Sequence, residues 1–123
     1  MSTLLIEGKW VAPVEGGTID VINPCTGDKF TTIDRGRAAD IDLAVKAAQR
    51  ALEGPWGQMT ATERGRIMMR LGELILKNNE ELAQIETKDT GKPMTVARND
   101  ITAVARYFEF YGGAADKVHG QTI

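Results

Sequence analysis

The side chains that most often carry out chemistry are few in this sequence. Cys25 is the only cysteine and His119 the only histidine among the 123 residues. Cys25 follows Pro24 in a stretch that reads as a turn, with no histidine or helix N-terminus beside it to favour a reactive thiolate. His119 has no second type of ligand at metal-binding spacing. We therefore predict a surface thiol, a solvated imidazole and no catalytic residue in this chain.

Two pairs of glycines lack the context of a phosphate-binding loop. Neither Gly16-Gly17 nor Gly112-Gly113 follows a strand and opens a helix at the required spacing, so we predict no cofactor-binding residue here. The acidic residues Glu80, Glu81 and Glu86 are most simply a solvated helix face, with charges that are favourable near a helix N-terminus.

The stretch of residues 86–93, Glu-Thr-Lys-Asp-Thr-Gly-Lys-Pro, has the composition of a boundary between two helices. Gly91 can take the left-handed conformation that ends a helix, and Pro93 fits the first turn of a new one. Asp89 and Thr90 have short polar side chains that can bond nearby backbone groups. Read from its chemistry alone, this stretch is a helix C-cap.

The pattern of apolar residues and turn residues predicts two short hairpins followed by helices. The expected strands are residues 4–6, 9–11, 18–22 and 29–33, and the expected helices are 39–52, 60–77, 79–89 and 93–111. Gly8 supplies the positive φ of the first hairpin turn. Thr60 and Glu63 form a capping box, and Asn79 is expected to cap the helix that it begins.

Apolar residues at helical spacing indicate which helix faces are buried. The expected stripes are Ile41, Ala44, Val45, Ala48 and Leu52 in the first helix, Ile67, Met68, Leu71, Leu74 and Ile75 in the second, and Ile101, Val104, Ala105 and Phe108 in the last. In the second helix Met69 and Leu76 lie outside the stripe, so we expect it to be covered on two sides. Trp56 is expected to fill a gap between helices.

The bulk composition is that of an ordinary folded domain, with 42% hydrophobic and 26% charged residues. The formal net charge of -2, with interspersed signs, argues against a nucleic-acid-binding face. No apolar run approaches the roughly 20 residues of a membrane span, and residues 1–7 lack the features of a secretory signal. A single cysteine fits a reducing compartment, so we expect a cytoplasmic protein.

Several motifs, in order along the whole chain, resemble the N-terminal region of the NAD(P)-dependent aldehyde dehydrogenase superfamily. They are Ile6-Glu7-Gly8-Lys9-Trp10, Asn23-Pro24-Cys25-Thr26-Gly27, residues 42–48, Trp56 with Glu63-Arg64, Ile67 and Leu71, residues 86–93, and residues 107–117. No single motif is specific, but their order and spacing together are.

The resemblance implies an α/β parent fold, of which this segment is mainly α-helical with two N-terminal β-hairpins. It implies that residues 1–123 are the N-terminal portion of the cofactor-binding domain, with hairpins in 1–36 and helices in 37–117. Residues 120–123 would lie just before the dinucleotide-binding sheet. The nucleophilic cysteine, the glutamate base, the oxyanion asparagine and the glycine-rich loop for NAD or NADP would follow in the remainder of the chain. The isolated segment would therefore be inactive, and the complete enzyme a homo-oligomer.

The resemblance also implies a place beside the substrate channel for the last helix, at Asp100, Ala103 and Tyr107. In relatives that oxidise aminoaldehydes, acidic residues at the first two of these positions attract the cationic group. Here Ala103 replaces the second acid, so Asp100 would help to position a polar or cationic aldehyde only weakly, and Ala103 would leave room for a bulkier tail. The alternative is that Asp100 is merely solvated in the early turns of a helix.

A potassium site is implied at Val21, Ile22 and Asp89. In some relatives, backbone carbonyls before the Asn-Pro turn and the aspartate of the Asp-Thr-Gly-Lys stretch hold this cation, with a further ligand from downstream. Hard cations prefer such oxygen ligands. The alternative is that Asp89 only bonds the helix end.

A different class of function also fits the residues. The chain could be a stand-alone helical module, without catalysis, that binds a protein partner or sibling enzyme subunits. The second helix, apolar over much of its girth, favours a scaffold piece that depends on further chain.

Overall fold

The computed structural model describes residues 3–120. Residues 121–123, which the family resemblance would place just before a dinucleotide-binding sheet, lie outside the described residues, as do residues 1 and 2 of the expected hairpin region. The contacts of the chain separate it into two compact units, Met1–Gln58 (unit 1) and Met59–Ile123 (unit 2). None of the helices within the described part has the length and hydropathy needed to cross a membrane.

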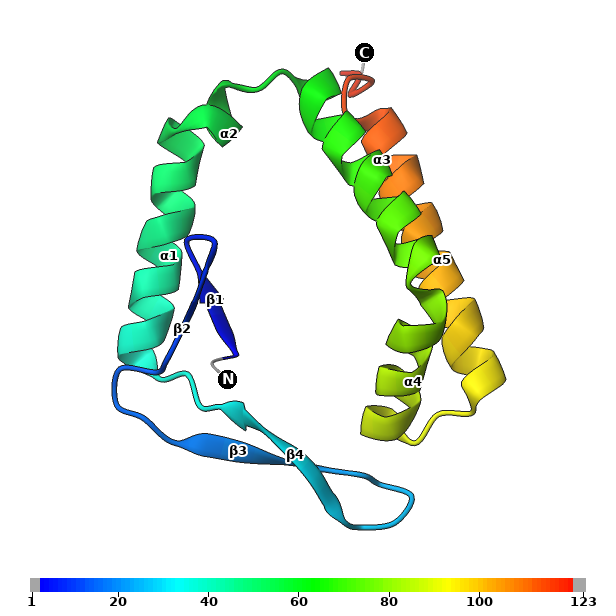
Figure 1. The fold of residues 1–123 in the computed structure, drawn as a ribbon. Coiled ribbons are helices and arrows are strands. Elements are labelled where there is room, and N and C mark those ends of the chain that lie inside the picture. The colour runs from blue at the N-terminus through cyan, green and yellow to red at the C-terminus, as the bar shows by residue number, and fades with distance from the viewer. Residues whose placement is uncertain (1–2, 121–123) are drawn as a thin grey trace. The chain divides into compact units, whose positions relative to one another are not determined.

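Unit 1 begins with the two predicted hairpins (Figure 1). The first pairs β1 (Leu4–Ile6) with β2 (Lys9–Val11), and the second pairs β3 (Thr18–Ile22) with β4 (Lys29–Asp34). Glu7 and Gly8 have φ angles of 54° and 73°, which is the pattern of the tight turn whose twist matches the flanking strands. The hairpin prediction is confirmed, and β4 runs one residue further than expected.

The buried side chain of Asp40 fixes the start of α1 (Ala38–Glu53). Its two carboxylate oxygens accept hydrogen bonds from the backbone N–H groups of Arg37 and Val14, each at 2.8 Å. Asp40 is only 3% exposed. These backbone bonds, led by that from Arg37, lower the pKa of Asp40 because they favour its charged form. One carboxylate thus caps the helix and anchors the loop that follows β2.

The predicted apolar stripe of α1 is not buried within unit 1. Three of its large members, Ile41, Val45 and Leu52, are among the exposed hydrophobic residues. The reason is that the β1–β2 hairpin, which lies against this helix, is too short to cover it. Gly54 ends α1, and Pro55 then starts the single turn of α2 (Pro55–Gln58), in which Trp56 is exposed rather than inserted between helices.

In unit 2, α3 (Ala61–Lys77) and α5 (Met94–Ala114) run side by side (Figure 1). The predicted capping box of α3 is confirmed: the Thr60 hydroxyl accepts from the Glu63 N–H, and the Glu63 carboxylate accepts from the Thr60 N–H at 2.8 Å. These bonds lower the pKa of Glu63, chiefly through the Thr60 N–H. A satisfied N-terminus defines where the helix begins.

The face of α3 that meets α5 matches the predicted stripe only in part: Ile67, Met68 and Ile75 are half-buried, and Ile75 packs against the core. Its buried residues are Gly65 and Gly72, whereas Leu71 and Leu74 of the expected stripe are 41% and 55% exposed. A β-carbon on Gly65 would lie 2.3 Å from the carbonyl oxygen of Gly112. The two backbones therefore touch, and any side chain at this crossing would hold them apart.

The core of unit 2 is built from small residues and one isoleucine of α5. Ile101 and Ala105 are buried as predicted, but Val104 is 40% exposed. Gly112 is buried at the crossing, and the helix continues beyond the predicted end at residue 111 to Ala114. The core cluster consists of Ala83, Ala97 and Ile101, with Ile75, Leu82 and Met94 packed against it.

The short helix α4 (Asn79–Thr90) joins this pair through polar bonds. Its N-cap is Asn78, and the predicted capping role of Asn79 is wrong, because the Asn79 amide donates to the Arg98 carbonyl and the Thr102 hydroxyl of α5. The Arg98 guanidinium donates twice to the Glu80 carboxylate, at 2.8 and 2.9 Å, and this contact lowers the pKa of Glu80. Side chains at the start of α4 thus tie it to α5.

We predict that Gly65→Ala destabilises the chain by about 1–3 kcal/mol, because the new methyl group forces the α3 and α5 backbones apart. Gly113→Ala is the matched control: it lies beside the crossing in α5, and its β-carbon would meet no atom within 4 Å. It should stabilise by about 0.5–1 kcal/mol through helix propensity. Urea unfolding followed by circular dichroism measures both, and equal midpoints for Gly65→Ala and the unchanged chain would contradict the close approach.

We predict that Asp40→Asn makes stability less dependent on pH in the acid range. Since the pKa of Asp40 is lowered by folding, its contribution is complete above the unfolded value of about 3.9 and is lost as the pH falls through the folded value. The variant should be less stable at pH 7, with a smaller loss below about pH 4. Thermal unfolding between pH 2 and 7 tests this. Asp42→Asn, on an exposed position of the same helix, should keep the acid dependence of the unchanged chain.

Candidate functional site

The reversal between α4 and α5 is made by residues 86–93, as the sequence predicts. Gly91 has a φ of 75°, in the left-handed region, and its N–H donates to the Thr87 carbonyl at 2.9 Å. The Thr90 hydroxyl donates to the Glu86 carbonyl at 2.7 Å. Pro93 then precedes the first residue of α5. These bonds satisfy backbone carbonyl groups at the end of α4, and the turn sets the direction in which α5 begins.

Lys92 connects the two helices at this reversal. Its ammonium group donates to the carboxylate of Glu86 on α4 and, at 2.6 Å, to Oδ2 of Asp100 on α5. The side chains of Lys92 and Glu86 are 29% and 27% exposed, and that of Asp100 is 46% exposed. Hydrogen bonds to Asp100 first, and then to Glu86, raise the pKa of Lys92. We call these three residues the Lys92 triad; it carries two negative charges and one positive charge.

The Lys92 triad was not predicted from the sequence. The rules that pair charges three or four residues apart hold within one helix, and they do not reach across a helix reversal. The signal that could have found it is the reversal itself, because Gly91 and Pro93 fold α5 back toward α4. Asp100, predicted either as a channel residue or as a solvated side chain, is neither isolated nor fully solvated.

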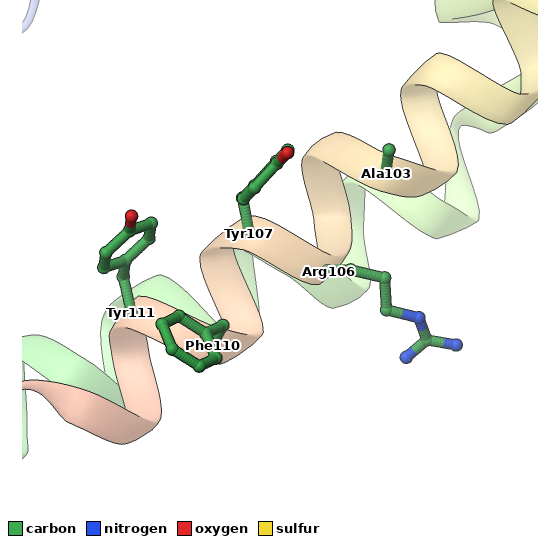
Figure 2. A pocket seen from close by; sticks show the side chains of 5 residues that line it. All are labelled: Ala103, Arg106, Tyr107, Phe110 and Tyr111. Atoms are coloured by element: carbon green, nitrogen blue, oxygen red, sulfur yellow. The ribbon is translucent and has the colours of Figure 1, made fainter.

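A surface pocket of about 610 Å³ lies along α5 and is lined by Ala103, Arg106, Tyr107, Phe110 and Tyr111 (Figure 2). The structure thus places two of the three predicted channel residues, Ala103 and Tyr107, in one pocket, and Asp100 outside its lining. The rings of Tyr107 and Tyr111 project on the same side of the helix, whereas the Arg106 side chain extends away from them.

The walls of the pocket are aromatic and open to solvent. Tyr107, Phe110 and Tyr111 are 64%, 69% and 58% exposed, and the rings of Phe110 and Tyr111 meet edge to face with centroids 5.2 Å apart. The Arg106 guanidinium donates to Glu109 at 2.6 Å. Sequence analysis missed Phe110 and Tyr111, although the dense run of aromatic residues in 107–111 was the available signal. Such a surface can pack against an apolar or aromatic group.

The residues of the predicted potassium site fall in different units. Val21 and Ile22 are the last residues of β3 in unit 1, where a register shift between them interrupts the regular pairing with β4. Asp89 is an exposed residue near the end of α4 in unit 2. Among residues 3–120, no group of three histidine, cysteine or acidic side chains is arranged to hold a metal ion. The potassium site therefore stays a prediction.

The other two residues considered for chemistry lie at the surface. Cys25 is in the turn between β3 and β4, where its N–H donates to the Asn23 side chain at 2.9 Å. His119 follows α5 and is exposed. Among the described residues, the predicted channel residues Ala103 and Tyr107 belong to the α5 pocket, and Asp100 belongs to the Lys92 triad.

Comparison with known proteins connects this geometry to one family. The model of the aldehyde dehydrogenase family matches residues 10–123. The mitochondrial aldehyde dehydrogenase family 2 member B4 of Arabidopsis thaliana is 45% identical over 122 residues, which are 98% of this chain and 23% of that protein.

Solved structures of the same family have the same fold. An aldehyde dehydrogenase from Bacillus cereus in complex with NAD+ superimposes with a TM-score of 0.92 at 42% identity, over 97% of this chain and 25% of that one. A variant of betaine aldehyde dehydrogenase from Staphylococcus aureus, also in complex with NAD+, superimposes with a TM-score of 0.90 at 36% identity. The match covers 97% of this chain and 24% of that one.

The chain thus spans about a quarter of the length of the relatives it matches. The expected fold class, an N-terminal segment of the aldehyde dehydrogenase fold with two hairpins followed by helices, is confirmed. The sequence alignments and the structural superpositions cover nearly the whole chain, and the chain therefore belongs to the aldehyde dehydrogenase family.

Proposed function

We propose that this chain is the N-terminal part of an enzyme that oxidises aldehydes to carboxylic acids with NAD or NADP. The observation that supports this most strongly is the match of 97% of the chain to one quarter of a solved aldehyde dehydrogenase that holds NAD+. The proposal assigns residues 1–123 to the N-terminal portion of the cofactor-binding domain. The complete enzyme would work in the cytoplasm as a homo-oligomer.

The residues described here do not fit the dinucleotide itself. The N–H groups of a phosphate-binding loop must open a helix after a strand. Gly16 and Gly17 instead precede β3, and Gly112 is packed against Gly65 inside α5. Cofactor binding, and with it hydride transfer, is therefore assigned to the remainder of the enzyme, together with the nucleophilic cysteine and the general base.

The contribution of this chain to the reaction would be to border the aldehyde entrance. The pocket on α5 supports this role, since Ala103 and Tyr107 line it and its exposed rings offer an apolar surface. Ala103 is the smallest lining residue, so it leaves room for a bulky tail. Tyr107 adds a hydroxyl to the lining. Asp100 lies one turn before Ala103 and would influence the charge of what enters.

We retain potassium as a proposed structural cation of the complete enzyme. The backbone carbonyls of Val21 and Ile22 and the carboxylate of Asp89 are oxygen ligands of the kind that a hard cation prefers. The interrupted pairing at the end of β3 supports this, because a bulge leaves backbone groups outside the regular ladder. A further ligand would have to come from the remainder of the chain.

We predict that the isolated chain neither reduces NAD or NADP in the presence of aldehydes nor binds either cofactor, whereas the complete enzyme does both. The reason is that the chemistry is assigned to residues beyond this segment. Absorbance of the reduced cofactor measures turnover, and calorimetry measures binding. Turnover by the isolated chain that survives repurification would contradict the assignment. A complete protein that oxidises no aldehyde but captures a partner would favour the helical-module alternative.

We predict that Ala103→Phe in the complete enzyme lowers kcat/KM for aldehydes with bulky tails about tenfold, by filling the α5 pocket, and spares short aldehydes. Thr95→Phe, at an exposed position in the first turn of α5, is the control and should change neither. Steady-state kinetics over a series of aldehydes of increasing size provide the test. An equal loss for short and bulky aldehydes would show that Ala103 does not border the entrance.

A further inference from the structure

We propose that Lys92 sets the charge preference of the aldehyde entrance, as a positioning residue that acts through Asp100. This inference rests on the proposed function. It assigns a role to a lysine that lies outside the pocket and that the proposed reaction does not use. The result would be an entrance that favours cationic aldehydes less than the charge of Asp100 alone would.

The first step of the argument is the contact between the two side chains. The Lys92 ammonium lies 2.6 Å from Oδ2 of Asp100, within hydrogen-bond distance. The lysine side chain is only 29% exposed, so water screens this pair less than a pair on the open surface. The ammonium charge offsets one of the two negative charges of the Lys92 triad, so Asp100 attracts a second cation more weakly than it would without Lys92.

The second step is that Glu86 holds the lysine in place. The Glu86 carboxylate accepts a hydrogen bond from the same ammonium group, from the opposite helix, and its side chain is 27% exposed. Lys92 is therefore fixed between α4 and α5 instead of swinging into solvent. Because Glu86 is the less exposed carboxylate, Asp100 is the one that a molecule approaching α5 would meet.

The third step is the position of Asp100 relative to the pocket. Asp100, Ala103 and Tyr107 follow i, i+3, i+7 spacing, which puts them on one stripe of α5. Ala103 and Tyr107 line the pocket, and Asp100 stands just beyond its end. Its charge is thus felt by a tail that lies in the pocket. The aromatic walls themselves would accept a cation, and Arg106 of the lining is paired with Glu109, so how far Lys92 compensates the charge of Asp100 would influence the choice between cationic and neutral tails.

The experiment compares two aldehydes of the same shape in the complete enzyme. One is 4-(trimethylammonio)butanal, whose cation does not titrate, and the other is 5,5-dimethylhexanal, its neutral carbon analogue. For each variant the quantity measured is the ratio of kcat/KM for the cationic aldehyde to kcat/KM for the neutral one. A purely structural role of Lys92 would change both values together and leave this ratio constant.

Lys92→Met is expected to raise the ratio about three- to tenfold, mainly through a lower KM for the cationic aldehyde, because it leaves the Asp100 charge uncompensated. Lys92→Arg keeps the positive charge and should keep the original ratio. In the double variant Lys92→Met/Asp100→Asn the rise should fall below about twofold, because only the more distant Glu86 remains. Lys92→Gln removes the charge but keeps donor groups, so it repeats the test should the Met variant not fold.

The two possible failures are distinguishable. If the unchanged enzyme oxidises neither aldehyde with NAD or NADP, the proposed function fails and takes this inference with it. If the enzyme is active but the ratio is the same in Lys92→Met and Lys92→Gln, only the role of Lys92 is wrong. A rise of equal size in the double variant would also overturn it. Lys77→Met, which removes an exposed lysine from α3, controls for net charge and should leave the ratio unchanged.

Discussion

The structure of unit 2 depends on direct contact between the backbones of α3 and α5. Gly65 and Gly112 face each other so closely that neither can carry a side chain without displacing the other helix. Dispersion contacts between two backbones need this proximity, and they are lost with a small separation. Because the crossing fixes the rotation of α5 about its axis, it also determines which residues are turned outward. The aromatic residues of the pocket are exposed for this reason.

The other end of α5 is fixed by charge together with close packing. The Lys92 triad and the Glu80–Arg98 pair connect it to α4, and the small core of Ala83, Ala97 and Ile101 lies between the helices. One helix is thus held near its C-terminal end by glycines and near its N-terminal end by ion pairs and a small apolar core. A rigid helix between two such anchors is a suitable support for a site, since side chains on it keep their relative positions.

Local chemistry determined what could be predicted from the sequence. The capping box at Thr60, the left-handed Gly91 and the turn at Gly8 depend on neighbouring residues only, and the structure confirms each. The glycines on the buried face of α3 could not be predicted from apolar periodicity, because a glycine has no side chain to add to that pattern and is buried only when another backbone packs against it. Leu71 and Leu74 fit the helical spacing of apolar residues, yet their side chains are exposed in this chain.

Candidate site residues were predictable to a smaller extent, because they depend on pairings between distant positions. Ala103 and Tyr107 share a pocket since they share a helix, but the partner of Asp100 comes from the other side of a reversal. Gly65 and Gly112 are also far apart in the sequence, and this has a consequence for the order of folding. During synthesis α3 emerges long before its partner, and it lacks a core of its own until α4 has turned the chain back. Within unit 2, α5 is synthesised after α3 and α4 and completes the packing, so a nascent chain interrupted before Gly112 would leave α3 without its matching surface.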